Sequence, residues 1–428
     1  MDSPVAFLKI ECENIEHLLD DSLRYSYGHF KSEEFYKECC SRLGLLKKYV
    51  NELNADDLKR RQHLAYKLSN LSALISRIQR SKLGEFSWPF AKALQELGTK
   101  LCQEAPFGGL ESNPIFPISA EGGLYSYKIF NEQADSDPIA NKKIFNIVFP
   151  TSLKDQVLLH PILAHEIGHA MFSITVKKKS LIDTVRSPLV ENSIFASVSD
   201  FSDWVKAVSG GKVLPNFDDS YDSWLEEYIC DLIGLVLFGP SFIAAHRVLL
   251  TSLKPLGTDL EEDHPPTLSR YCLLDQAVEI LGWKQSIKLS GSKKGLLTDF
   301  WTGIEALSEP VPPALKFFDD QQVREALSGL NSLFDQSESV QYDMPDSSKF
   351  SSLIDDLDNS VPPSISSISK KGEPMNESID FRSIIFAGWI TWYGANTGKL
   401  ADHSFLNINR LCNLSILQQE AINIWANK

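Results

Sequence analysis

The stretch "LLHPILAHEIGHAMF", residues 158–172, places two histidines and a glutamate in a run that is otherwise almost wholly apolar. On a helix, His165 and His169 lie one turn apart on the same face, so both imidazole rings can point at one metal ion. Glu166 lies about 100° further round the helix, outside the ligand direction. The stretch therefore predicts a helix that supplies two ligands to a zinc ion.

The spacing H-E-x-x-H also predicts a reaction. Zinc lowers the pKa of a bound water molecule, the carboxylate of Glu166 can accept its proton, and the hydroxide can then attack a carbonyl group. One alternative stays open at this point: His165 and His169 could be core residues bonded to backbone carbonyls, with Glu166 in solvent. His160, at the start of the same stretch, more commonly caps a helix or packs than binds metal.

A second apolar helix supplies the third ligand that a catalytic zinc needs. In "SWLEEYICDLIGLVLFGP", residues 223–240, Glu227 and Asp231 are four residues apart, and two acids in such a run are costly unless a metal or hydrogen bonds neutralise them. We assign Glu227 as the third ligand and Asp231 as the carboxylate that orients a ligand histidine. Glu226 faces about 100° away and is expected in solvent. Glu226 or Asp231 as the third ligand remains the alternative.

The composition describes a globular protein with a large core, since 43% of the 428 residues are hydrophobic and 10% are aromatic. A formal charge of −14, from 42 basic and 56 acidic residues, argues against nucleic acid as a partner. The seven cysteines are scattered and form no CxxC pair, which favours a reducing cytoplasm over a disulfide framework. The longest apolar run, residues 232–245, is too short to span a bilayer, and we find no secretory signal. We therefore expect a soluble, cytoplasmic protein without a membrane partner.

The two helices carry a resemblance to known enzymes. "HEIGH" followed by Glu227-x-x-x-Asp231 resembles the gluzincin group of zinc metallopeptidases. "DHPPTLSRY", residues 263–271, resembles the His-Pro and Arg segment of the CAAX-type and heat-shock-type metallopeptidases. The similar region covers about residues 160–271.

This resemblance implies functions for individual residues. The two histidines of the motif and Glu227 would hold one zinc ion per chain, and Glu166 would be the general base. His264 matches the downstream segment and would act as an oxyanion donor. Arg270 would be a structural or substrate-side cation. The alternative for this segment is that His-Pro-Pro merely begins a helix and that Arg270 pairs with an acidic neighbour.

The chain also departs from those two families, which are integral membrane proteins. Because we find no membrane-spanning segment in the sequence, we expect substrates other than membrane proteins and prenylated peptides. A looser resemblance connects "EEYICDLIGLVLFGP", residues 226–240, with the soluble repressor-cleaving metallopeptidases of bacterial mobile elements. In those enzymes HExxH is likewise followed by a Glu-containing apolar helix that ends near a proline.

The pattern along the chain predicts an α+β, mostly helical fold. Aromatic and β-branched residues in "GLYSYKIFNE" (123–132) and "KKIFNIVFPTS" (142–152) predict two strands. Apolar residues at three- and four-residue intervals predict helices elsewhere, including one break near Gly239. Together with the resemblance, this predicts an N-terminal helical domain (1–105), a zincin-like catalytic domain with a small sheet and the metal-site helices (106–334), a flexible Ser/Asp/Pro-rich linker or loop (335–380) and a C-terminal helical segment (381–428).

The sequence thus predicts a zinc-dependent metallopeptidase whose substrate is a protein or peptide. An extended substrate would pair with a free strand edge, either "FNIVFP" (145–150) or "YSYKIF" (125–130). Two alternatives stay open: a narrow-specificity regulatory protease that acts on one partner protein, and a non-catalytic protein in which zinc stabilises an interaction module. Glu166 separates catalysis from a structural role, because a structural zinc site needs no general base and usually closes its fourth position.

Overall fold

The structure is a computed structural model of the chain, and it divides into two compact units, Met1–Lys154 and Asp155–Lys428. Each unit is described by itself. The residues that the structure describes are 5–24, 32–54, 57–80, 87–103, 114–122, 128–131, 143–191, 193–209, 217–253, 260–286, 288–289, 291–307, 309–334, 340–364, 366–368, 374–376 and 379–426.

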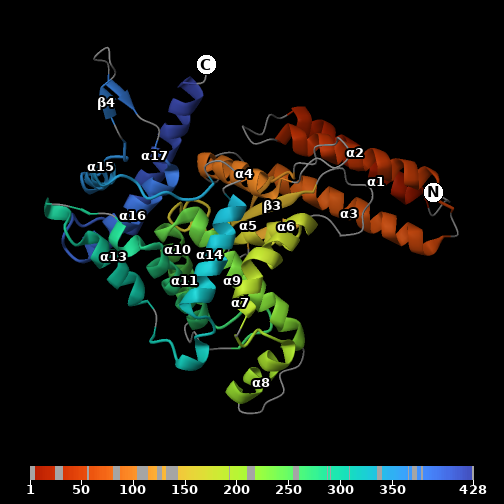
Figure 1. Cartoon of the computed structure of the whole chain (residues 1–428). Coiled ribbons are helices and arrows are strands. Elements are labelled where there is room, and N and C mark those ends of the chain that lie inside the picture. Colours follow the sequence, from red (N-terminus) through yellow and green to blue (C-terminus); the bar gives the residue numbers. More distant parts are fainter. Residues whose placement is uncertain are drawn as a thin grey trace. The chain divides into compact units, whose positions relative to one another are not determined.

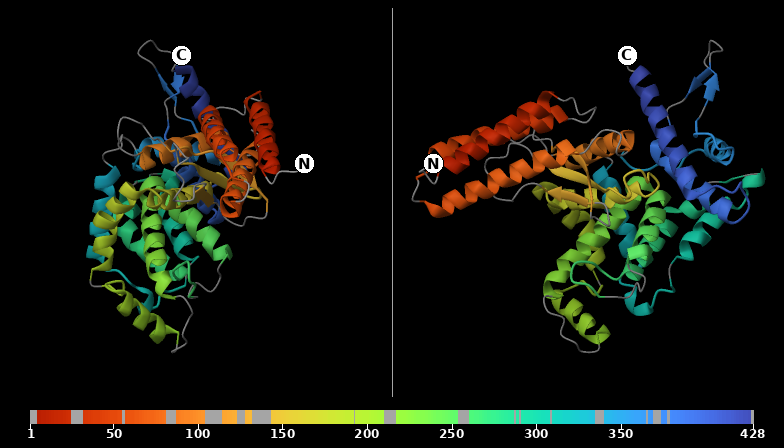
Figure 2. Two further views of the ribbon diagram at one scale, coloured as in Figure 1. Left: turned by 90° about the vertical axis from the view of Figure 1, so that its right-hand side faces the viewer. Right: turned by 180° about the vertical axis from the view of Figure 1, so that it is seen from behind.

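The first unit combines long helices with a small sheet (Figure 1). Its elements are α1 (Ala6–Arg24), α2 (Ser32–Asn51), α3 (Leu58–Arg80), α4 (Trp88–Cys102), β1 (Ile118–Glu121), β2 (Lys128–Asn131) and β3 (Phe145–Pro150). Helices α1, α2 and α3 pack against one another, as both views in Figure 2 show. On α1, the buried residues Leu8, Cys12, Ile15 and Leu19 recur at three- and four-residue intervals, so one face of the helix enters the core.

The three strands form one mixed sheet in the order β1-β3-β2. β1 pairs with β3 in parallel, with Ile118 opposite Ile147, and β2 pairs with β3 antiparallel, with Ile129 opposite Ile147. Strand β3 is buried along its whole length and occupies the centre. The prediction that 145–150 could be a free edge is therefore wrong, because both of its sides are already paired. The other candidate edge lies in β2, although residues 125–127 of it fall outside the described part.

The second unit is almost entirely helical (Figure 1). Its helices are η1 (His160–Ile162), α5 (Leu163–Phe172), α6 (Thr175–Leu181), η2 (Ile182–Arg186), α7 (Ser187–Val190), α8 (Val198–Val208), α9 (Phe217–Phe238), α10 (Pro240–Leu253), α11 (Thr267–Leu281), α12 (Trp283–Ser286), η3 (Gly291–Lys293), α13 (Leu296–Glu305), η4 (Pro313–Leu315), α14 (Asp320–Phe334), α15 (Ser347–Asp358), α16 (Phe381–Asn396) and α17 (Phe405–Ala426). A short hairpin of β4 (Ser366–Ile368) and β5 (Pro374–Asn376) lies between α15 and α16.

The predicted break in the second metal-site helix is confirmed. Helix α9 ends at Phe238, Gly239 adopts a φ of +60°, and α10 begins at Pro240. Only glycine adopts this left-handed conformation without steric cost, and the proline that follows cannot extend the helical hydrogen bonds. This turn folds α10 back so that it packs against α9.

The division into domains differs from the prediction in two places. The sheet belongs to the unit with the N-terminal helices, whereas the HExxH helix lies in the other unit. The predicted linker at 335–380 contains a true helix, α15, whose Phe350, Leu353, Ile354 and Leu357 are buried. Its N-cap is Asp346, which accepts hydrogen bonds from two backbone amides of the first turn. The Ser/Asp-rich composition concealed apolar residues at helical spacing.

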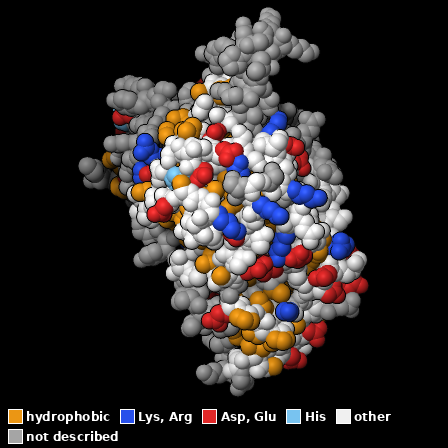
Figure 3. All heavy atoms as spheres, turned by 90° about the vertical axis from the view of Figure 1, so that its left-hand side faces the viewer, with side chains coloured by type: hydrophobic (Ala, Val, Ile, Leu, Met, Phe, Trp, Pro, Cys, Tyr) orange, Lys and Arg blue, Asp and Glu red, His pale blue; other side chains and the backbone are white. Residues whose placement is uncertain are grey.

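The coarse fold class is confirmed: the described residues are mostly helical, with one small mixed sheet and one hairpin. Within the described part of the chain, every helix is too short or too polar to cross a bilayer. On the face shown in Figure 3, acidic and basic side chains are interspersed, and hydrophobic side chains gather in its lower part. Exposed apolar residues on α8 include Val198 and Val208.

Candidate metal centre

Helices α5 and α9 pack closely against each other and position the centre. On α5, Leu163, Ile167 and Met171 are buried and anchor the helix. Gly168 lies between the two histidines of the motif, where an added Cβ would be 2.7 Å from Sγ and 3.0 Å from Cα of Cys230 on α9. The missing side chain therefore lets the two helices approach closely enough for their polar residues to meet.

We expect Gly168→Ala to lower the free energy of unfolding by about 1–3 kcal/mol, because the methyl group overlaps the backbone of α9. In an open helix the same change stabilises by about 0.5–1 kcal/mol. Gly44→Ala on α2 is the matched control, since no atom lies within 4 Å of a Cβ placed there. Urea unfolding of both variants measures the difference. Equal effects in the two variants would contradict the close approach of α5 and α9.

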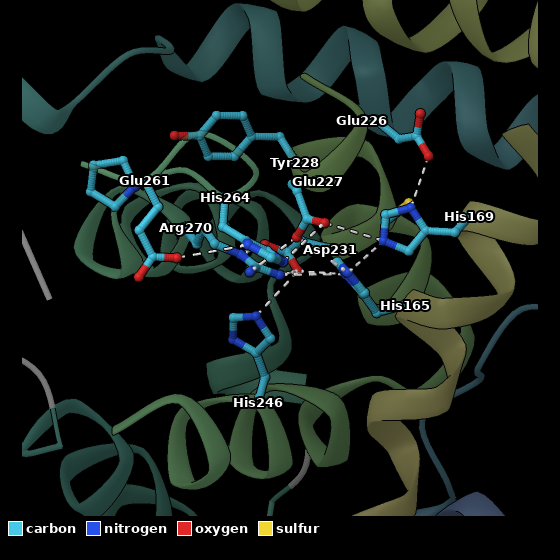
Figure 4. A network of polar contacts seen from close by, with 12 residues as sticks. His165, His169, Glu226, Glu227, Tyr228, Asp231, His246, Glu261, His264 and Arg270 are labelled. Atoms are coloured by element: carbon cyan, nitrogen blue, oxygen red, sulfur yellow. Dashed lines mark hydrogen bonds and ion pairs between the residues drawn. The ribbon is translucent and has the colours of Figure 1, made fainter. Parts of the chain in front are cut away.

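Three potential ligand atoms converge between these helices (Figure 4). The Nε2 atoms of His165 and His169 lie 3.1 Å apart. One carboxylate oxygen of Glu227 lies 3.4 Å from Nε2 of His165, and the other lies 3.2 Å from Nε2 of His169. Ligand atoms at about 2.0–2.2 Å in a zinc tetrahedron are roughly 3.3–3.6 Å apart. The distance from His165 to Glu227 lies in this range and the other two lie slightly below it, so the cluster is close to the size of a tetrahedral zinc site.

Two carboxylates on α9 lie beside the Nδ1 atoms of the two imidazole rings, on the side opposite the Nε2 atoms (Figure 4). Nδ1 of His165 lies 2.9 Å from an oxygen of Asp231, and Nδ1 of His169 lies 2.8 Å from an oxygen of Glu226. Each carboxylate accepts a hydrogen bond from Nδ1–H, so the lone pair of Nε2 in each ring is available to a metal ion. The structure places Asp231 beside its predicted partner. It also gives Glu226, which the sequence predicted in solvent, a matching position at the second histidine.

Arg270, on α11, is buried and pairs with both acids of the α9 motif. Its Nε and Nη2 donate to the two oxygens of Asp231, each at 2.7 Å. Its Nη1 lies 3.1 Å from an oxygen of Glu227. Of the two functions expected for Arg270, the contacts are those of a structural cation that pairs with acidic neighbours. This pairing explains how an apolar helix can carry two buried carboxylates.

The charges of the cluster shift the pKa values of its members. Burial raises the pKa of Glu227 and of Asp231, but Arg270 and the histidines outweigh it, so both pKa values lie well below the usual range. Burial lowers the pKa of His165, but the charge of Glu227 and the hydrogen bonds to Asp231 and Glu227 raise it overall. At neutral pH both carboxylates are therefore charged, and a metal ion competes with protons for the histidines.

His264 lies beside this cluster, in the segment before α11. Its Nε2 is 3.8 Å from Glu227 and its Nδ1 is 3.8 Å from Glu261, and 44% of its side chain is exposed. Among the described residues, the only group that could hold a metal ion is the one formed by both α5 histidines and Glu227. His264 and the buried His160 are thus not ligands in this arrangement. The side chain of Glu166, the expected general base, is half-buried on α5. Solvent reaches the side of the cluster where His264 lies.

Comparison of the chain with protein-family models, curated proteins and solved structures gives no match. The interpretation of the centre therefore depends on its own geometry and on the spacing of its motif. Sequence reasoning missed the contact of Glu226 and a further histidine, His246 on α10, which lies close to Asp231. The signal for Glu226 was available, because a second ligand histidine also needs a partner at Nδ1.

Proposed function

We propose that the chain is a zinc-dependent metallopeptidase that hydrolyses peptide bonds in proteins or peptides. The observation that supports it best is the convergence of potential ligand atoms from His165, His169 and Glu227, whose spacing is close to that of three corners of a tetrahedral zinc site. Catalytic zinc sites have three protein ligands and one open position, whereas structural sites usually have four. Within the described residues the cluster has three.

The remaining residues have distinct functions in this proposal. When bound, zinc supplies a Lewis acid that activates water and polarises the substrate carbonyl. Glu166 accepts a proton at its carboxylate and passes it to the leaving amine. His264, half-exposed beside Glu227, donates a hydrogen bond to the negative charge that develops on the carbonyl oxygen. Asp231 and Glu226 keep the ligand histidines in the binding tautomer.

The proposal includes a zincin-like core, one zinc per chain and a cytoplasmic location. The packing of the HExxH helix against a helix with a ligand glutamate supports the zincin-like arrangement. The single cluster among the described residues supports one zinc ion. All seven cysteines are free, which is consistent with a reducing compartment.

Zinc content tests the centre directly. We expect the purified chain to retain about one zinc after dialysis, because a site with three protein ligands binds the ion tightly. His165→Ala removes one ligand, so we expect its zinc content to fall toward zero. His63→Ala, an exposed histidine on α3, is the matched control and is expected to retain the metal. If His165→Ala bound zinc with unchanged stoichiometry and affinity, the assigned ligand set would be wrong.

A further inference from the structure

A third helix contributes to the centre through His246 on α10. This histidine is 1% exposed, and in Figure 4 its ring points toward Asp231. Nε2 of His246 lies 3.2 Å from the same carboxylate oxygen that faces His165. The ring centroids of Phe242 and Tyr271 lie 5.3 and 6.0 Å from that of His246. Among the described residues, neither ring nitrogen forms a hydrogen bond, so the approach of Nε2 to Asp231 is a close polar contact.

Burial makes His246 a neutral imidazole. Loss of solvent lowers its pKa to about 4, although the charge of Asp231 opposes this effect. A neutral imidazole carries one N–H group, and a buried N–H without a partner is costly. The carboxylate of Asp231, 3.2 Å from Nε2, is the acceptor available to this N–H when Nε2 carries the proton.

The backbone explains why His246 reaches this carboxylate. Gly239 turns the chain between α9 and α10, and Asp231 and His246 lie at similar distances before and after it in the sequence. Two helices that fold back at such a turn bring these positions level with each other. Gly234 on α9 leaves the space that the ring of Phe242 on α10 fills, so the two helices pack closely at this level.

We propose that His246 is a positioning residue, which holds the carboxylate of Asp231 and, through it, the ring of His165 in the orientation that binds metal. Arg270 holds both oxygens of Asp231 from α11, while it also pairs with Glu227. His246 approaches the oxygen that faces His165 from a different helix, α10, and adds a further contact at that oxygen. The inference rests on the proposed metal centre, but it does not require peptidase activity.

The experiment measures zinc affinity by competition with a chelator. His246→Leu removes the N–H at similar volume, and we expect zinc to bind about 10–100-fold more weakly, as for other groups that orient metal ligands. In His246→Gln the amide nitrogen reaches the position of Nε2, so we expect most of the affinity to return. In His246→Asn the shorter amide does not reach Asp231, so we expect weak binding. The glutamine and asparagine variants keep a polar group in the core, so their comparison tests the proposal if His246→Leu does not fold.

His403→Leu is the matched control. His403 is buried in the same unit, and its Nε2 lies 2.9 Å from the backbone oxygen of Asp358. We expect this variant to lose stability but to keep its zinc affinity. Equal zinc affinity in wild type, His246→Leu and His246→Asn would overturn the positioning role while the metal centre stands. If the wild-type chain bound no zinc, the centre itself would be refuted, and the inference with it.

Discussion

Glu166→Gln is expected to leave zinc bound and to lower kcat/KM for peptide hydrolysis by about 10²–10⁴-fold, the usual contribution of a general base. Glutamine has almost the same size as glutamate but cannot accept a proton at neutral pH. Because Glu166 is not one of the three ligands in the cluster, its amide leaves the metal-binding atoms unchanged. The variant therefore separates proton transfer from metal binding.

The measurement combines metal analysis with turnover of a peptide library by wild type and variant. Glu191→Gln, an exposed glutamate in the same unit, is the matched control and is expected to have unchanged activity. Full turnover by Glu166→Gln would show that the proposed mechanism is wrong. A wild-type chain that binds zinc but hydrolyses no peptide would favour the non-catalytic alternative.

Arg270→Leu is expected to lower the free energy of unfolding of the metal-free protein by about 3–5 kcal/mol, because it leaves two buried carboxylates without their cation. Glu227 and Asp231 both have lowered pKa values in the folded protein, so their contribution to stability is present above the ordinary carboxyl pKa and is lost as the pH falls. At neutral pH the variant therefore buries two carboxylates that have lost their guanidinium partner. Added zinc is expected to restore part of the loss, because it supplies positive charge to the same carboxylates.

Denaturant unfolding with a chelator and with zinc measures both effects. Arg186→Leu is the matched control, since Arg186 pairs with Asp222 at the surface, where 75% of the aspartate side chain is exposed. We expect a loss of less than about 1 kcal/mol there. A loss in Arg270→Leu no larger than in this control would mean that the buried pairing contributes little to stability.

Local patterns in the sequence were sufficient to predict much of the centre. The four-residue spacing of His165 and His169, and that of Glu227 and Asp231, puts each pair on one helical face, and the structure brings these faces together. The end of α9 at Gly239 could also be predicted from the sequence, because the backbone preferences of glycine and proline depend only on those residues themselves.

Other features depend on contacts between distant residues and could not be predicted. His246 reaches Asp231 only because α10 folds back on α9, and nothing in its own sequence neighbourhood indicates a polar partner. The central place of β3 follows from parallel pairing with β1, a strand that its short sequence did not reveal. Helix α15 is concealed for a different reason: the Ser/Asp-rich composition of residues 335–380 indicates a loop, although Phe350, Leu353 and Leu357 recur at helical spacing.

The carboxylate of Asp231 receives groups from three other helices, namely His165 on α5, His246 on α10 and Arg270 on α11. Substitutions of these residues therefore share one partner, and their free-energy changes will not add in double-mutant cycles. We therefore expect α5, α9, α10 and α11, which meet at this side chain, to unfold cooperatively.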